Sequence, residues 1–229
     1  MLQARIAELL RPFLVSSPNS CHSESGQRPE EESAVLSASQ LQHISTYIDL
    51  LRRWNARINL TAIRDEEEIV IRHFGESLFA ARCLFPREGA SAPAIADLGS
   101  GAGFPGVPIK LWAPEISLTL IESNQKKAAF LREVARALTF TDVNIQNARA
   151  EDLDPNQTFD LVTLRAVERF AAILSTAARL VSPGGRLALL IGSSQVNEAQ
   201  TVLPEFLWRP EIPIPSSKAR TLLVGTKEP

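Results

Sequence analysis

The sequence predicts an α/β protein with a mainly parallel, Rossmann-like sheet. From residue 94 onwards, short apolar runs alternate with segments of helical periodicity, which is the pattern of a parallel sheet covered by helices on both faces. The first apolar run leads directly into a glycine-rich turn, and the second ends at an acidic residue. Both features are typical of the strand ends at which open α/β sheets bind ligands.

Two regions are expected, an N-terminal helical extension over residues 1–90 and a sheet domain over 91–229. Residues 1–15 carry charges within an apolar stretch, as an amphipathic helix does and a signal peptide does not. Ser, Pro, Glu and Gly dominate residues 16–36, which we expect to form a polar loop of no assignable role.

Two further helices are expected in the extension. Ser37 and Gln40 match a capping box, and apolar residues at helical spacing follow as far as Trp54. Asp65 begins a second N-terminal signature, and that helix is expected to run to about Leu84.

The sheet domain is expected to end in an antiparallel pair. Short runs at 205–209 and 220–225 are separated by a proline-rich connection, which lets them pair antiparallel. Class I S-adenosylmethionine-dependent methyltransferases have this arrangement. The other expected strands are 94–98, 116–121, 142–146, 159–164 and 186–191, and the expected helices are about 106–112, 124–138 and 168–180.

Residues 99–106, hereafter the glycine turn, predict a nucleoside site together with Glu122. Glycine permits positive φ and lets a ligand lie against bare backbone, and the following helix offers unpaired N–H groups. Glu122 ends the second strand, where a carboxylate can accept hydrogen bonds from both hydroxyls of a ribose. The turn also contains Gly-x-Gly-x-x-Gly, which leaves a nicotinamide-dependent oxidoreductase open, and glycine turns also join strands to helices without any ligand.

Composition limits the remaining possibilities. The chain has 229 residues and a net charge of -2, which neither demands nor excludes a nucleic acid partner. Two cysteines and three histidines provide neither a disulfide framework nor the spacing of a zinc site. We therefore expect a cytoplasmic monomer without a metal or a membrane segment.

Several motifs occur together in one order. They are DLGSGAGFPG at 97–106, ESNQKKAAFL at 122–131, RAE at 149–151 and RAV at 165–167, preceded by WN at 54–55, NLT at 59–61, RD at 64–65 and His73. On these motifs the chain resembles the RsmG (GidB) family over about residues 41–192. The resemblance implies an S-adenosyl-L-methionine (SAM) cofactor. It also implies methylation of the ring nitrogen at position 7 of a guanosine in bacterial 16S rRNA, either free or within the small ribosomal subunit.

The predicted cofactor site combines the glycine turn with contacts that the resemblance implies. Phe104 and Gly99 would touch the methionine end, and residues 150–151 would flank the adenine. Phe104 could instead fill the core, and Arg165 could pair with Glu168. The predicted cofactor-binding residues are Gly99, Gly101, Gly103, Phe104, Glu122, Ala150, Glu151 and Arg165.

No catalytic base is expected. The ring nitrogen already presents a lone pair and has no proton to lose, so the protein mainly has to hold nitrogen, methyl carbon and sulfur in line. Because fold does not determine the acceptor, another RNA, a small molecule, or a cofactor-binding regulator without turnover remain alternatives.

RNA contact is expected around residues 52–64, which contain four arginines and no acid. Basic side chains there could meet phosphates, and Trp54 could stack on a base. Trp54 could equally anchor its helix to the core, with the arginines balanced by residues 66–68. The RNA-binding candidates are Arg53, Trp54, Arg57, Asn59, Arg64 and Arg149.

Three positions depart from the family pattern. Glu76 stands where an aspartate usually precedes the serine, Leu164 where serine is common before the arginine, and Ile191 where lysine commonly precedes the glycine. Loss of the lysine would remove a contact for an anion at the mouth of the site.

Overall fold

The computed structural model describes residues 1–15, 35–85, 92–166 and 170–228. Most of the expected polar loop at 16–36 lies outside this range, as does Glu168. No helix in the described ranges is both long and apolar enough to cross a bilayer.

The helices of the N-terminal region form as expected, with one difference. Helix α1 spans Gln3–Leu14 and α2 spans Ala38–Asn55, and both hydrogen bonds of the capping box between Ser37 and Gln40 are present. The helix expected from Asp65 to Leu84 is divided into α3 (Glu66–Ile69), the π-helical η1 (Val70–Gly75) and α4 (Glu76–Leu84). A π segment occurs frequently at functional sites, and in this one the Arg72 carbonyl accepts a hydrogen bond from Arg165, the last residue of a strand of the sheet.

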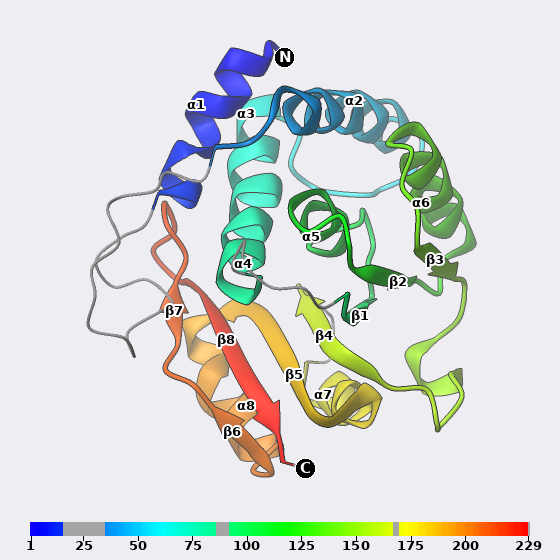
Figure 1. The fold of residues 1–229 in the computed structure, drawn as a ribbon, viewed down its shortest axis with the longest axis vertical. Helices are drawn as coiled ribbons and strands as arrows, with labels where there is room; N and C mark the ends of the chain where they lie inside the picture. The colour runs from blue at the N-terminus through cyan, green and yellow to red at the C-terminus, as the bar shows by residue number, and fades with distance from the viewer. Residues whose placement is uncertain (16–34, 86–91, 167–169, 229) are drawn as a thin grey trace.

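The sheet has the strand order β3-β2-β1-β4-β5-β8-β6, with the short β7 paired to β8 (Figure 1). Strands β1 to β5 are parallel, and β8 is antiparallel to both β5 and β6. The parallel sheet and the C-terminal antiparallel pair were both predicted, and both are confirmed. The strands are β1 (Ala94–Leu98), β2 (Ser117–Ile121), β3 (Val143–Gln146), β4 (Phe159–Arg165), β5 (Val181–Gly192), β6 (Phe206–Trp208), β7 (Ile212–Pro213) and β8 (Arg220–Lys227).

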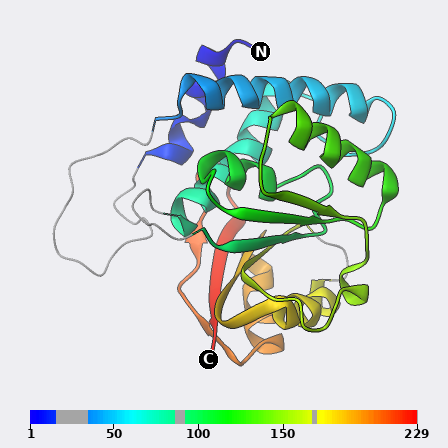
Figure 2. The same ribbon diagram turned by 45° about the vertical axis from the view of Figure 1, so that its right-hand side comes forward.

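Helices cover both faces of the sheet (Figure 2). One core lies between the sheet and α1, α2, α4 and the sheet-domain helices α5 and α6, and includes Tyr47 and Phe130. The other lies under α7 and α8 and includes Leu174 and Ala199. The sheet-domain helices are α5 (Gly106–Trp112), α6 (Gln125–Ala137), α7 (Phe170–Leu180) and α8 (Val196–Val202), with 3-10 turns η2 (Ala150–Asp152) and η3 (Ser193–Gln195).

Strand β5 begins five residues earlier than expected, at Val181 rather than at residue 186. Residues 182–185 have the composition of a turn, but Val181 pairs with Phe159 and a register shift absorbs the following residues. The Ser182 hydroxyl also donates to the Phe159 carbonyl at 2.9 Å. The pairing of Val181 with Phe159, which are distant in the chain, therefore starts β5 earlier than the local composition predicts.

Helix α1 is held to the π segment by close packing of Phe13 on Gly75. Phe13 is 1% exposed, and a Cβ on Gly75 would lie 2.5 to 2.8 Å from its ring. We expect Phe13→Ala to lower the free energy of unfolding by about 3 to 5 kcal/mol, because it leaves a cavity between two elements. Urea denaturation measures this loss. Leu2→Ala, at a side chain 81% exposed, is the control and should leave stability nearly unchanged.

Candidate functional site

The glycine turn adopts a backbone that L side chains rarely take. Gly99, Gly101 and Gly103 have φ values of 68°, 57° and 86°. A Cβ on Gly101 would meet only the Gly99 carbonyl oxygen, at 3.7 Å. The turn is therefore open at Gly101, and a ligand can approach its backbone there.

Glu122 and the glycine turn lie against each other. The Gly101 N–H donates to one carboxylate oxygen at 2.9 Å, and the Asn124 N–H donates to the other at 2.7 Å. Glu122 is 7% exposed. A carboxylate offers about four acceptor sites, so the bonds to Gly101 and Asn124 leave others for a ligand.

Further hydrogen bonds join the ends of β1, β2 and β3. The Ser100 N–H donates to the Ile121 carbonyl at 3.0 Å, and the Ser100 hydroxyl donates to the Asp97 carbonyl at 2.8 Å. The Asn147 amide donates to the Glu122 carbonyl at 2.8 Å. These bonds fix the strand ends relative to one another before any ligand binds.

Asp97 is a site residue that sequence reasoning did not single out. It is 1% exposed, and its carboxylate accepts hydrogen bonds from the Thr163 hydroxyl at 2.9 Å and the Gly106 N–H at 3.2 Å. Asp97 therefore joins β1 to β4 and to the first residue of α5. Burial raises the pKa of Asp97 to about 6, although the bonds from Thr163 and Gly106 oppose this shift.

Phe104 lies in an aromatic stack at the base of the turn. Its ring is parallel to Tyr47 at 5.3 Å between centroids and nearly parallel to His73 at 4.7 Å, and only 7% of the residue is exposed. The Tyr47 hydroxyl donates to the Ala102 carbonyl. These contacts support the alternative in which Phe104 fills the core, and its contact with SAM stays a prediction.

His73 is held as a neutral side chain. Its Nε2 lies 2.8 Å from the Thr61 hydroxyl. Burial, reinforced by Arg165, Arg72 and Arg220, lowers the pKa of His73 to about 3. A structural role, which is the common one for a histidine between helices, fits this environment.

Arg165 forms a buried ion pair with Glu76. The Arg165 guanidinium reaches one Glu76 oxygen at 3.0 Å, and the side chains are 7% and 1% exposed. Arg220 contacts the same oxygen at 2.9 Å, and Arg72 contacts the other at 3.1 Å. Burial lowers the pKa of Arg165 to about 10, with Glu76 opposing the shift. The cluster of Glu76 with Arg72, Arg165 and Arg220, hereafter the Glu76 cluster, thus has an excess of positive charge.

The sequence did not predict Glu76 as the partner of Arg165. Glu168, the partner weighed there, lies outside the described residues, whereas Glu76 is 89 residues from Arg165 in the chain. The only local signal was the spacing of Arg72 and Glu76, four residues apart on one helix.

Residues 150–151 follow β3 as predicted. Ala150 is buried, and its carbonyl accepts a hydrogen bond from the Arg179 guanidinium at 3.1 Å. Glu151 is exposed. The structure thus places one of the two predicted adenine contacts inside the fold and one at its surface.

Five of the six RNA-binding candidates are exposed, and Trp54 is half-buried. Trp54 donates to the Glu133 carboxylate at 2.9 Å and packs edge-on against Phe130, as its anchoring alternative requires. Arg53 lies 3.9 Å from the same carboxylate. Side chains facing solvent are those of Arg53, Arg57, Asn59, Arg64 and Arg149.

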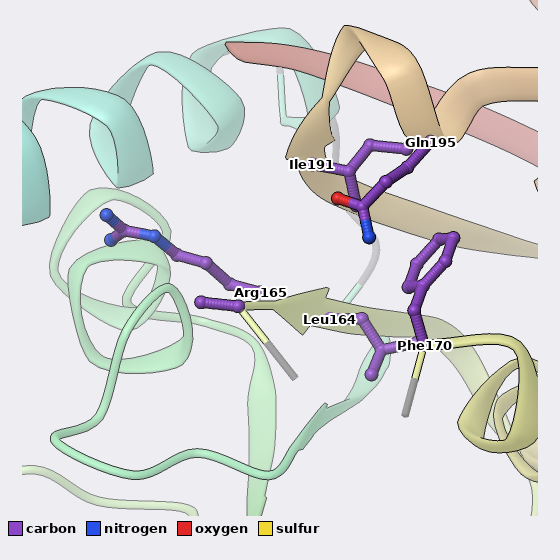
Figure 3. A pocket seen from close by; sticks show the side chains of 6 residues that line it. Leu164, Arg165, Phe170, Ile191 and Gln195 are labelled. Atoms are coloured by element: carbon purple, nitrogen blue, oxygen red, sulfur yellow. The ribbon is translucent and has the colours of Figure 1, made fainter. Parts of the chain in front are cut away.

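A small hollow lies at the carboxyl ends of β4 and β5 (Figure 3). Its volume is about 90 Å³. The residues that line it are Leu164, Arg165, Ala166, Phe170, Ile191 and Gln195.

Residues 40–208 match the family model described as rRNA small subunit methyltransferase G. The chain belongs to this family. A relative from Roseiflexus sp. (strain RS-1), named ribosomal RNA small subunit methyltransferase G, is 40% identical over 203 residues, which cover 84% of this chain and 85% of that one. A relative of the same name from Halorhodospira halophila is 39% identical over 87% of this chain and 94% of its own. Membership confirms the resemblance seen in the motifs.

The comparison with solved structures confirms the predicted class I methyltransferase fold. Magnesium protoporphyrin IX methyltransferase from Synechocystis, in a structure with bound SAM, has a TM-score of 0.62. It is 15% identical and covers 85% of this chain and 99% of that one. At this identity the similarity concerns the fold alone.

Asp97 should make stability depend on pH. Its pKa of about 6 in the folded protein exceeds its ordinary value of 3.8, so its contribution to stability is complete below about pH 4 and is lost as the pH rises through about 6. Relative to Asp97→Asn, the natural protein should lose roughly 3 kcal/mol of unfolding free energy over that interval, at about 1.36 kcal/mol per pKa unit. Urea denaturation of both proteins across this range measures the difference, and a difference independent of pH would contradict the assignment.

The Glu76 cluster should respond unequally to loss of its members. Glu76→Gln leaves three guanidinium groups without their shared carboxylate, and we expect a loss of about 3 to 5 kcal/mol in unfolding free energy. Arg165→Met leaves Glu76 with Arg72 and Arg220, so the loss should be smaller. Glu67→Gln, which breaks the exposed pair with Arg5, is the control and should have little effect. Equal losses for Glu76→Gln and Glu67→Gln would show that the cluster is not a buried network.

Proposed function

We propose that the protein transfers the methyl group of SAM to the ring nitrogen at position 7 of a guanosine in bacterial 16S rRNA. Family membership supports the enzyme class, the cofactor and a small-subunit rRNA substrate. The observation within the structure that carries the proposal is the hydrogen bond between the Gly101 N–H and the Glu122 carboxylate. It brings a ribose acceptor to an open stretch of backbone.

The residues present fit the cofactor. Glu122 retains acceptor capacity for the ribose hydroxyls, and the glycine turn offers backbone beside it with no side chain at Gly101. The proposed cofactor contacts remain Gly99, Gly101, Gly103, Phe104, Glu122, Ala150, Glu151 and Arg165. When bound, SAM supplies a methyl group activated by its sulfonium.

The protein's part in the reaction is to orient the reactants. A guanine ring nitrogen has a lone pair ready for attack, so no side chain has to remove a proton. The hydrogen bonds at the ends of β1, β2 and β3 hold the turn in place. Glu76 holds the Arg165 guanidinium at the end of β4. Orientation of this kind is worth up to about 7 to 11 kcal/mol in favourable cases.

The finer parts of the proposal concern RNA and organisation. RNA phosphates would be contacted by the exposed side chains of Arg53, Arg57, Asn59, Arg64 and Arg149. Trp54, which is anchored to Glu133, would hold the end of α2 in position beside them. Arg52 and Arg64 also line a hollow of about 150 Å³ beside α2. The partner would be the small ribosomal subunit or its free rRNA, met in the cytoplasm by a monomer. Residues 1–90 would serve as a helical extension of a methyltransferase domain at 91–229.

Methyl transfer is tested with labelled SAM and either free 16S rRNA or undermethylated small subunits. We expect 7-methylguanosine after nuclease digestion and chromatography of the product. Its absence from both substrates would refute the proposed function. SAM binding without any methyl transfer would favour the alternative of a cofactor-binding regulator without turnover.

Glu122→Ala tests the cofactor site. We expect at least a tenfold loss of SAM affinity in calorimetry, because charge-assisted hydrogen bonds to the ribose are removed. Glu115→Ala, at an exposed acid just before β2, is the matched control and should bind as the natural protein does. A folded Glu122→Ala variant with unchanged affinity would remove Glu122 from the site.

A further inference from the structure

The hollow at the ends of β4 and β5 is separate from the proposed ribose site but close to it in the sheet. Leu164 of β4 lines the hollow. It pairs in register with Leu98 of the neighbouring strand β1, and Leu98 immediately precedes the glycine turn. One strand spacing therefore separates the hollow from the turn. At about 90 Å³ the hollow is well below the roughly 300 Å³ of a pocket for a whole drug-sized ligand. It can accept the edge of a ring.

Gln195 presents hydrogen-bond donors to this hollow. The Gly192 N–H donates to Gln195 Oε1 at 3.1 Å. Because an N–H needs an acceptor, this bond determines which end of the amide is oxygen. The amide nitrogen of Gln195 is directed toward Leu164 and Phe170 (Figure 3).

The remaining wall is apolar. Phe170 is 8% exposed, Ile191 4% and Leu164 fully buried. Leu164 and Ile191 are two of the positions at which this chain departs from the family pattern, where serine and lysine are common. The Arg165 guanidinium is held by Glu76 and points away from the hollow (Figure 3). Among the described residues that line the hollow, Gln195 is thus the side chain that offers polar groups to its interior.

We propose that the hollow receives the O6 and N7 edge of the target guanine, with Gln195 Nε2 donating a hydrogen bond to O6. This inference rests on the proposed function. Guanine presents an acceptor at position 6, whereas adenine presents an amino donor there. If adenine entered the hollow, the Gln195 amide N–H groups would face its amino group, and neither donor group would have an acceptor. The contact therefore selects guanine. Since O6 and N7 share one edge of the ring, the same bond orients N7, and Phe170 gives the base an apolar contact surface.

Two substitutions at Gln195 distinguish the role of its N–H donors from that of its hydrogen bond with the Gly192 N–H. Gln195→Glu can still accept from the Gly192 N–H but replaces the donors with a charged acceptor. Gln195→Met keeps the length of the side chain and removes both functions. Gln200→Glu is the control, because it places the same charge on an exposed position of α8, outside the hollow.

We expect Gln195→Met to lower kcat/KM for RNA about fivefold to tenfold, the effect of one neutral hydrogen bond. Gln195→Glu should lower it further, by at least about tenfold, because an anion then faces O6. The dissociation constant for SAM should remain unchanged in both variants, and Gln200→Glu should behave as the natural protein does. Unchanged kcat/KM in folded Gln195→Met would overturn the proposal.

A second measurement uses RNA with 2-aminopurine at the methylated position, mapped first with the natural protein. This base keeps N7 but lacks O6. The natural protein should methylate it about fivefold to tenfold less efficiently than guanine, and Gln195→Met should show little discrimination between the two bases. If the natural protein forms 7-methylguanosine but both proteins discriminate equally between the two bases, the inference is overturned. Failure of the natural protein to form that product would instead refute the proposed function.

Discussion

The hydrogen bond from the Gly101 N–H to the Glu122 carboxylate depends on the parallel register of β1 and β2. Leu98 and Ile121 are partners in that register, so both strands end at the same level. The residues that follow therefore meet without a long loop. If β2 ran antiparallel to β1, its carboxyl end would lie beside the amino end of β1. No rotation of the Glu122 side chain could then bring its carboxylate to the glycine turn. The strand arrangement is thus the primary requirement of the site, and the glycines are the second.

The Glu76 cluster joins the N-terminal helices to the end of β4, beside the candidate site. Glu76 begins α4, Arg72 lies in the π segment, Arg165 ends β4 and Arg220 begins β8. One buried carboxylate thus joins the N-terminal region to both the parallel and the antiparallel parts of the sheet. Buried ion pairs add little net stability over apolar packing but strongly disfavour arrangements in which one member lacks its partner. We therefore expect the cluster to specify how the N-terminal helices dock and, through Arg165, how the end of β4 is presented.

Features that depend on local sequence were predictable. The apolar runs of β1, β2 and β4 are rich in buried branched residues such as Ile95, Leu120 and Val162, and Ser37 with Gln40 forms a cap through contacts three residues apart. The register of parallel strands then places Glu122 beside the turn, which is why one strand end could be inferred from another. These inferences required only periodicity and the rule that carboxyl ends of parallel strands share one edge.

Features that depend on distant partners were not predictable from one sequence. Glu76 and Arg165 are 89 residues apart, and the stack of Phe104 joins Tyr47 and His73 from two different helices. Several acids could have paired with Arg165 on charge alone, and only the docking of α4 on the sheet selects Glu76. The early start of β5 has the same origin, since the pairing of Val181 with Phe159 outweighs a turn-like composition.

The edge of the sheet divides into two halves with different chemistry. At β1 and β2, backbone N–H groups and the Glu122 carboxylate provide polar contacts that suit a ribose. At β4 and β5, the lining of Leu164, Phe170 and Ile191 is apolar and contains the Gln195 amide. Asp97 and Thr163 join the two halves through a buried hydrogen bond between the adjacent strands β1 and β4. Because methyl transfer to a ring nitrogen requires alignment rather than proton removal, we expect the rate to depend on the relative position of these halves. A rigid link between neighbouring strands is therefore of more use to this enzyme than a general base.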